Sequence, residues 1–300
     1  MRSDMAGPDR SRLKLTIDLD ATGFQVGDIM LRWSDNANPL GYYPVPIVSF
    51  KSGPGPTVMV LGGTHGDEFE GPAAILRLAE HLRQAQFSGQ IILLPAFNAP
   101  ALAASSRVSP LDDGNLNRAF PGHANGGPTA MLAHFLETEL IPKCDAVIDL
   151  HSGGQASVFA ACALATQTSD RTLCDVNFAL ARVFGLPLIW ALGEHNDNRS
   201  VNAAAERCGI PMIAAELGGG GGVDPVITGL AFTGLQNCLV HLGCLNRDLP
   251  NLPAPRCVEI KSPLHSTYAP SDGLFDRAGS AGHEVAARDS AADPGLPLQP

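Results

Sequence analysis

The sequence predicts an α/β fold: a mixed, mostly parallel sheet with helices on both faces, followed by a small C-terminal β segment. Two observations favour it. Short apolar runs rich in β-branched residues alternate along the chain with stretches of helical periodicity, which is typical of strands joined by helices. The length of 300 residues also allows one large domain with an appendage.

The first half of the chain contains the strongest strand signals. Short strands are expected at 13–22 and 43–53. An apolar strand at 57–63 ends in Gly-Gly and leads into a helix over 71–85, where Pro72 suits a first turn. The next expected elements are a strand at 90–98, a helix over 128–143 and a strand from 145.

The second half repeats this alternation. Further helices are expected at 176–186, 200–209 and 226–243, and further strands at 188–193 and 211–220. A linker at 251–256 then precedes short β segments. We therefore predict one large α/β domain over 11–250, and a short β segment with a tail over 257–300.

Composition and charge exclude several classes of protein. Hydrophobic residues make up 45% and charged residues 17%, so the chain is globular and not disordered. The net charge of −10 argues against nucleic acid or an anionic membrane as partner. No apolar run reaches the ~18 residues of a membrane span, and the first residues lack the apolar stretch of a signal peptide.

Cysteine usage indicates the compartment. The seven cysteines include no C-x-x-C pair, which favours free thiols in a reducing environment over a disulfide framework. We therefore expect a cytoplasmic protein. The oligomeric state stays open, a homo-oligomer included.

Chemically capable side chains follow three of the predicted strands. His65 and Glu68 come directly after the strand at 57–63, His151 follows another, and Glu216 ends a third. Because open α/β sheets bind ligands at the carboxyl ends of their strands, these residues are expected to converge. Two histidines and a glutamate, with a fourth position left for water, match a catalytic zinc site. The H-x-x-E spacing alone is a weak signal, since chance matches are frequent.

Other candidates have both a functional and a structural interpretation. A carboxylate in a buried strand needs a partner or a purpose, which favours a site role for Glu216. Arg118 lies in a long irregular stretch, and such loops are commonly functional. Arg107 could equally be a surface charge and Asn117 a turn residue. Asp67 is more readily interpreted as a turn residue than as a ligand.

Five motifs occur in an order that carries a family resemblance. They are HGDE (65–68), SSR (105–107), NLNR (115–118), DLH (149–151) and AEL (215–217). Over roughly residues 45–245 the chain resembles the succinylglutamate desuccinylase/aspartoacylase family, relatives of the zinc carboxypeptidases. Within that family, GGTHGDEFEGP, NLNRAFPG and ELGGGGG are most similar to the group of N-alpha-acetyl-L-2,4-diaminobutyrate deacetylases of ectoine breakdown.

The resemblance implies a role for seven residues. One Zn²⁺ ion per chain would be held by His65, Glu68 and His151. The other implied roles are general acid/base for Glu216, polarisation of the scissile carbonyl for Arg107, and binding of the substrate α-carboxylate for Asn117 and Arg118. The family's C-terminal β module looks incomplete here, because the sequence after YAPSDGLF is short and atypical for it.

The expected function is zinc-dependent hydrolysis of the amide bond of a small N-acyl amino acid, foremost the deacetylation of N-alpha-acetyl-L-2,4-diaminobutyrate in ectoine degradation. Two alternatives stay open: a zinc carboxypeptidase acting on short peptides, and a catalytically silent metal- or ligand-binding homologue. A diaminobutyrate substrate needs an acidic group facing its ammonium. The available candidates are Asp112, Asp113, Glu194 and Asp197.

Overall fold

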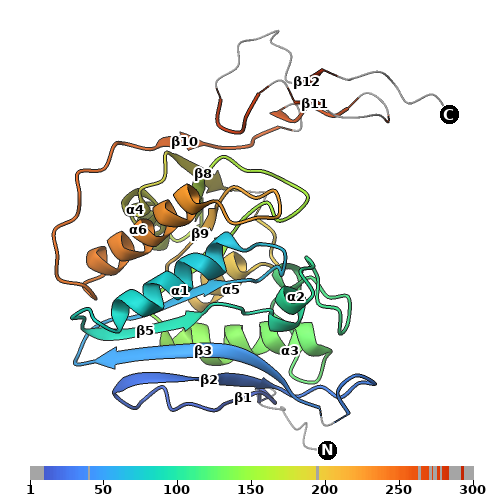
Figure 1. Cartoon of the computed structure of the whole chain (residues 1–300). Coiled ribbons are helices and arrows are strands. Elements are labelled where there is room, and N and C mark those ends of the chain that lie inside the picture. Colours follow the sequence, from blue (N-terminus) through green and yellow to red (C-terminus); the bar gives the residue numbers. More distant parts are fainter. Residues whose placement is uncertain are drawn as a thin grey trace, which may run out of the picture.

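A ten-stranded mixed sheet forms the centre of the protein (Figure 1). The computed structural model describes residues 10–39, 41–193, 196–262, 265–269, 272, 276–277, 279–283 and 292–293. The strands of this sheet are β1 (Lys14–Leu15), β2 (Gly23–Leu31), β3 (Tyr43–Ser52), β4 (Thr57–Gly62), β5 (Gly89–Leu94), β6 (Ala146–His151), β7 (Cys162–Thr166), β8 (Leu188–Leu192), β9 (Met212–Glu216) and β10 (Arg256–Val258). Their spatial order is β1-β2-β3-β5-β4-β6-β9-β7-β8-β10.

The middle of the sheet is parallel. β5, β4, β6 and β9 are parallel neighbours, whereas β1, β2 and β3 join one side in antiparallel fashion and β7 pairs antiparallel with β9. Gly62 pairs with Leu150, and His151 pairs with Glu216. The carboxyl ends of β4, β6 and β9 therefore lie side by side at one edge.

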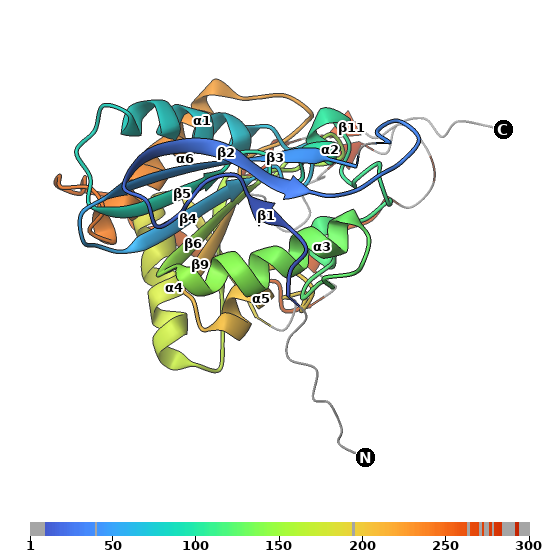
Figure 2. The same cartoon turned by 90° about the horizontal axis from the view of Figure 1, so that it is seen from below.

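Helices cover both faces of the sheet, which confirms the predicted architecture (Figure 2). The helices are α1 (Glu70–Leu82), α2 (Ala99–Ala103), α3 (Pro128–Phe135), α4 (Arg171–Phe184), α5 (Val201–Cys208) and α6 (Pro225–His241). Successive residues of β4 point to opposite faces, as strand geometry requires. Val58 and Val60 belong to the core shared with α1, α4 and α6, whereas Met59 and Leu61 belong to the core shared with α3 and α5.

One predicted strand is wrong in its bounds, and two strands were not predicted. The strand expected at 13–22 is reduced to Lys14–Leu15, and the longer strand is β2, where none was predicted. β2 contains glycine and exposes Phe24 and Val26 near the sheet margin, so its sequence lacks clean alternation. β7 was also missed, because the short run CALAT contains two alanines, which have low strand propensity.

Two helices differ most from their predicted bounds. α3 ends at Phe135, and a π-helical turn and a 3-10 turn follow it, where one helix was expected over 128–143. Pro142 explains the break, since it lacks an amide hydrogen and clashes with the preceding helical turn. α4 begins at Arg171, before the predicted start, because the Asp170 side chain accepts bonds from the amides of the first turn.

The chain after residue 250 continues the main sheet, since β10 pairs in parallel with β8. A separate antiparallel pair is formed by β11 (Asp276–Arg277) and β12 (Ala292–Asp293). Residues 284–291 and 294–300 of the expected tail lie outside the described residues. Of the helices in the described ranges, none has the length and apolar character needed to cross a membrane.

Candidate functional site

Three neighbouring strands carry the candidate residues to one place. His65 and Glu68 lie in the turn between β4 and α1, His151 is the last residue of β6, and Glu216 is the last residue of β9. Because these strands are parallel neighbours, residues up to 151 positions apart in the sequence (65 to 216) meet at one edge of the sheet. The expected convergence is therefore present.

Glu68 lies between the two histidines. Its Oε1 atom is 2.7 Å from His65 Nδ1, and its Oε2 atom is 2.8 Å from His151 Nδ1. The backbone amide of Ser152 also donates to Oε2, at 3.1 Å. One ligand atom from each of His65, Glu68 and His151 lies within 4.8 Å of the others, and all three residues are buried. Among the described residues this is the group of histidine, cysteine and acidic side chains that could hold a metal ion.

The outer nitrogens of both histidines are also held. His65 Nε2 lies 3.1 Å from Asn115 Oδ1, and His151 Nε2 lies 2.8 Å from Asp149 Oδ2. An outward hydrogen bond of this kind fixes the ring and leaves the inner nitrogen free to bind a metal. Two imidazole nitrogens and a carboxylate, so oriented, form a donor set that fits Zn²⁺.

The three side chains and Asp149 form a buried charge network. Burial favours the neutral acid, yet the two histidines hold the pKa of Glu68 far below its ordinary value. Burial likewise opposes a charged imidazole, but Asp149 and Glu68 raise the pKa of His151 well above its ordinary 6.5. The two carboxylates therefore favour the charged form of His151, so this site stabilises positive charge.

Glu216 lines the same pocket as His65, Glu68 and His151. Its Oε2 atom is buried and, among the described residues, has no hydrogen-bond partner. Burial raises the pKa of Glu216 to about 8, although His151 acts in the opposite direction. A carboxyl group with such a pKa and a free oxygen can both accept and donate a proton near neutral pH.

The seven residues predicted from the sequence line one pocket of about 250 Å³. Arg107 Nη1 donates to Glu68 Oε1 at 3.1 Å, which places its guanidinium beside the two histidines. Asn117 and Arg118 come from the short 3-10 turn Leu116–Arg118, far from the strand ends in sequence. The pocket therefore combines a metal-capable group, an uncommitted acid and two arginines.

Other contributors were not predicted. Asn115, which holds His65, is the first residue of the NLNR motif and could have been found there. The segment after β6 lines the pocket through Ser152, Gly153, Ala156, Ser157 and Phe159. Asp67 belongs to the turn, as expected, but also lines the pocket, and its Oδ2 atom accepts from the Gln155 amide at 3.0 Å.

None of the acidic residues suggested for ammonium recognition is among those that line this pocket in the described chain. Asp112 bonds to the backbone and hydroxyl of Thr129, and Asp197 bonds to two arginines. Asp113 is exposed, and Glu194 lies outside the described residues.

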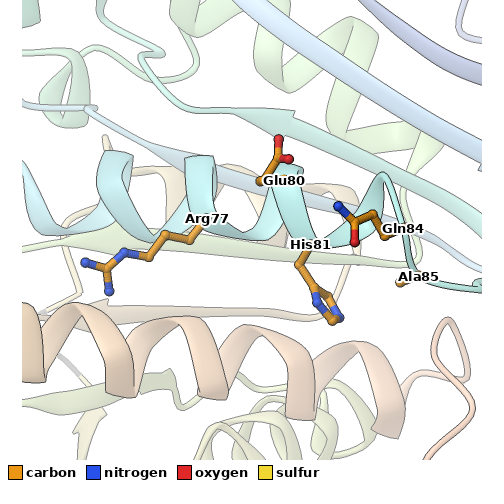
Figure 3. A pocket seen from close by; sticks show the side chains of 5 residues that line it. All are labelled: Arg77, Glu80, His81, Gln84 and Ala85. Atoms are coloured by element: carbon orange, nitrogen blue, oxygen red, sulfur yellow. The ribbon is translucent and has the colours of Figure 1, made fainter.

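A second depression, of about 470 Å³, follows α1 (Figure 3). Arg77 and His81 point toward α6, where the His81 ring meets Phe232 edge-on at 5.8 Å between centroids. Its five lining residues, Arg77 to Ala85, come from α1 and the turn after it. This groove therefore brings together no set of catalytic groups comparable with the pocket at the strand ends.

Gly66 sets the position of the turn that carries His65 and Glu68. A Cβ atom there would lie 2.0 Å from the carbonyl carbon of Ala101, so α2 leaves no room for a side chain. We expect Gly66→Ala to destabilise the protein by about 1–3 kcal/mol and to weaken metal binding, because the turn must shift. Thermal unfolding and metal content test this. Gly229→Ala is the control, since its Cβ would meet nothing within 4 Å, and wild-type behaviour of Gly66→Ala would contradict the expectation.

Comparison with known proteins identifies relatives of this chain in sequence and in fold. The model of the succinylglutamate desuccinylase/aspartoacylase catalytic domain matches residues 54–242. The chain is 34% identical over 277 residues to the N-alpha-acetyl-L-2,4-diaminobutyric acid deacetylase of Halomonas elongata, covering 92% of this chain and 81% of that protein.

Solved structures with a similar fold include relatives of the same kind. A product-bound structure of the ectoine utilization protein EutE (DoeB) from Ruegeria pomeroyi is similar with a TM-score of 0.89 and 34% identity, over 94% of this chain and 86% of that one. The structure of a succinylglutamate desuccinylase from a Silicibacter species is similar with a TM-score of 0.88 and 34% identity, over 97% of this chain and 88% of that one. With a family model matched over more than half of its length, the chain belongs to the succinylglutamate desuccinylase/aspartoacylase family.

Proposed function

We propose that the protein is a zinc-dependent amidohydrolase of N-acyl amino acids, which removes the acetyl group of N-alpha-acetyl-L-2,4-diaminobutyrate in ectoine degradation. The observation that carries the proposal is the free buried oxygen of Glu216 beside the His65–Glu68–His151 group in one small pocket. The named activity of the Halomonas elongata relative supports the choice of acyl group and amino acid.

In this proposal the metal acts as a Lewis acid and Glu216 transfers protons. When bound by His65, Glu68 and His151, zinc supplies Lewis-acid chemistry, which polarises a carbonyl and lowers the pKa of water. Glu216 takes a proton from the attacking water and delivers it to the leaving amine. Its raised pKa supports both roles, because the same group must be a base and then an acid.

The arginines and Asn117 handle negative charge. Arg107 donates to the amide carbonyl oxygen as charge develops there, a contribution of typically several kcal/mol in a dry site. It already donates to Glu68 at 3.1 Å, and its other N–H groups remain for that oxygen. Asn117 and Arg118 bind the α-carboxylate of the amino acid, for which a planar guanidinium is well suited.

The proposal includes a cytoplasmic location. All seven cysteines are free thiols, and four of them are buried. Proteins with this usage of cysteine are typical of reducing compartments, which supports the choice.

Product detection tests the proposal. Purified protein loaded with Zn²⁺ should release acetate from N-alpha-acetyl-L-2,4-diaminobutyrate and lose this activity when a chelator removes the metal. N-acetylaspartate and a short peptide, assayed side by side, should be poorer substrates. Faster cleavage of the peptide would favour a carboxypeptidase, and preference for N-acetylaspartate would contradict the assigned amino acid.

Metal binding should depend on pH. Because Asp149 and Glu68 raise the pKa of His151 well above 6.5, this imidazole carries a proton that must leave before a metal binds. The apparent zinc affinity should therefore rise with pH, by about tenfold per pH unit while one proton is displaced. Competition titrations against a chelator at pH 6, 7 and 8 measure the slope, and a constant affinity would contradict the displaced proton.

A further inference from the structure

Two segments far apart in the sequence, 115–120 and 197–201, are joined beside the pocket. The backbone amide of Phe120 donates to the Arg199 carbonyl at 3.1 Å. The amide of Val201 donates to the Asn117 side-chain oxygen at 3.0 Å. Val201 is the first residue of α5, whose amide has no partner within the helix. This bond occupies the acceptor of the Asn117 carboxamide, so its NH₂ group remains for an anion.

Asp197 is saturated by arginines. Its Oδ1 atom accepts from Arg199 Nε at 3.0 Å and from the Arg199 amide at 2.9 Å. Its Oδ2 atom accepts from Arg199 Nη2 at 2.9 Å and lies 3.0 Å from Arg118 Nε. Arg199, and to a lesser degree Arg118, lower the pKa of Asp197 to about 2, so the carboxylate stays ionised. With both oxygens occupied, it has little capacity left for a substrate ammonium.

Arg118 is held on one side and open on the other. Its Nε group faces Asp197, and Nη1 donates to the Asn117 carbonyl at 2.6 Å. A guanidinium has five N–H groups, so three remain after these two bonds. The side chain is 41% exposed and lines the pocket. The contacts therefore fix the orientation of Arg118 and leave N–H groups for a ligand.

The charges of Arg118, Asp197 and Arg199 leave a net positive charge beside the pocket. Asp197 alone would neutralise Arg118 and weaken its attraction for an anion. Arg199 supplies a second positive charge to the same carboxylate, so the three side chains together keep a charge of +1. An anionic ligand in the pocket therefore still meets a net positive group.

From these contacts we propose that Asp197 is a positioning residue that orients Arg118 toward the α-carboxylate of the substrate, with Arg199 balancing its charge. The inference rests on the proposed function, in which Arg118 binds that carboxylate. Asp197 acts through Arg118 and not on the reacting atoms, so its loss should weaken substrate binding without slowing the chemical step.

Kinetics of Asp197→Asn test the inference. With the zinc-loaded enzyme and N-alpha-acetyl-L-2,4-diaminobutyrate, KM should rise about tenfold, as for a misplaced hydrogen bond to a charged group, while kcat changes less than about twofold. Asp197→Glu keeps the carboxylate and should restore part of the affinity. Glu137→Gln is the matched control, because it removes a similar bidentate arginine pair, with Arg207, away from the pocket.

A double-mutant cycle separates positioning from a general loss of stability. In an Arg118→Ala background, Asp197→Asn should cause no further rise in KM, because the residue through which it acts is gone. If Asp197→Asn raised KM equally in the wild-type and Arg118→Ala proteins, the inference would be wrong. It would also be wrong if Asp197→Asn left KM unchanged in an enzyme whose wild type is active. Neither result would contradict the proposed function. An inactive wild type would overturn the proposed function and the inference with it.

Discussion

Replacement of Glu216 by glutamine is expected to lower kcat by about 10²- to 10⁴-fold, the usual contribution of a general acid/base. Glutamine has nearly the same size but neither accepts nor delivers a proton at neutral pH. Because Glu216 is not one of the three metal-capable residues, the metal content should stay at the wild-type value. Initial rates of acetate release and elemental analysis of the same samples provide both measurements.

A second buried carboxylate serves as control for this substitution. Glu70 is also buried, and both of its oxygens lack hydrogen-bond partners among the described residues, yet it does not line the pocket. Glu70→Gln should keep kcat within about twofold of wild type, since it removes no proton-transfer group from the pocket. Full activity of Glu216→Gln would show that another group transfers the proton.

Replacement of Glu68 by glutamine should abolish metal binding and, with it, detectable activity. Glu68 contacts both His65 and His151, so the substitution replaces the central carboxylate by a neutral amide, a weaker ligand for a cation, and disturbs both imidazoles. A ligand that binds only the folded state stabilises it, by about 2.7 kcal/mol at a hundredfold excess over Kd. Wild-type protein should therefore unfold at a higher temperature when Zn²⁺ is added, and Glu68→Gln should not.

His81→Ala is the control for loss of a histidine side chain at a site unrelated to metal binding. It lies in the groove along α1 (Figure 3). Neither His81 nor its neighbour Phe232 is among the residues that line the pocket at the strand ends. The variant should keep the zinc-dependent rise in unfolding temperature. A similar rise in Glu68→Gln would mean that Zn²⁺ binds elsewhere.

Much of the site could be predicted from the sequence, because most of the site residues stand directly at the ends of strands that the sequence itself indicates. His65, His151 and Glu216 each follow or close an apolar strand, and parallel strands present their carboxyl ends at one edge. Their convergence requires only that β4, β6 and β9 be neighbours, which the alternation of strands and helices favours. The long irregular segment already made Arg118 a candidate, and the family resemblance then assigned roles to Arg107, Asn117 and Arg118, for which that segment has no periodicity to place them.

The features that escaped prediction depend on contacts between distant segments. The short β7 contains two alanines and has little intrinsic strand preference, yet it is stabilised by pairing with β9, where Cys162 lies opposite Glu216. From the sequence, Asp197 was a candidate for binding the substrate ammonium. Nothing in the sequence shows that Arg118 pairs with its carboxylate. Such pairings depend on tertiary packing and not on local propensity.

The most direct test of the account is an anomalous difference map, recorded at the zinc absorption edge from crystals of protein purified with Zn²⁺. We expect one strong peak per chain, bounded by Nδ1 of His65, the Glu68 carboxylate and Nδ1 of His151, with Glu216 nearby but not bound to the ion. The absence of a peak between these three side chains, or a peak held by other residues, would contradict the central claim.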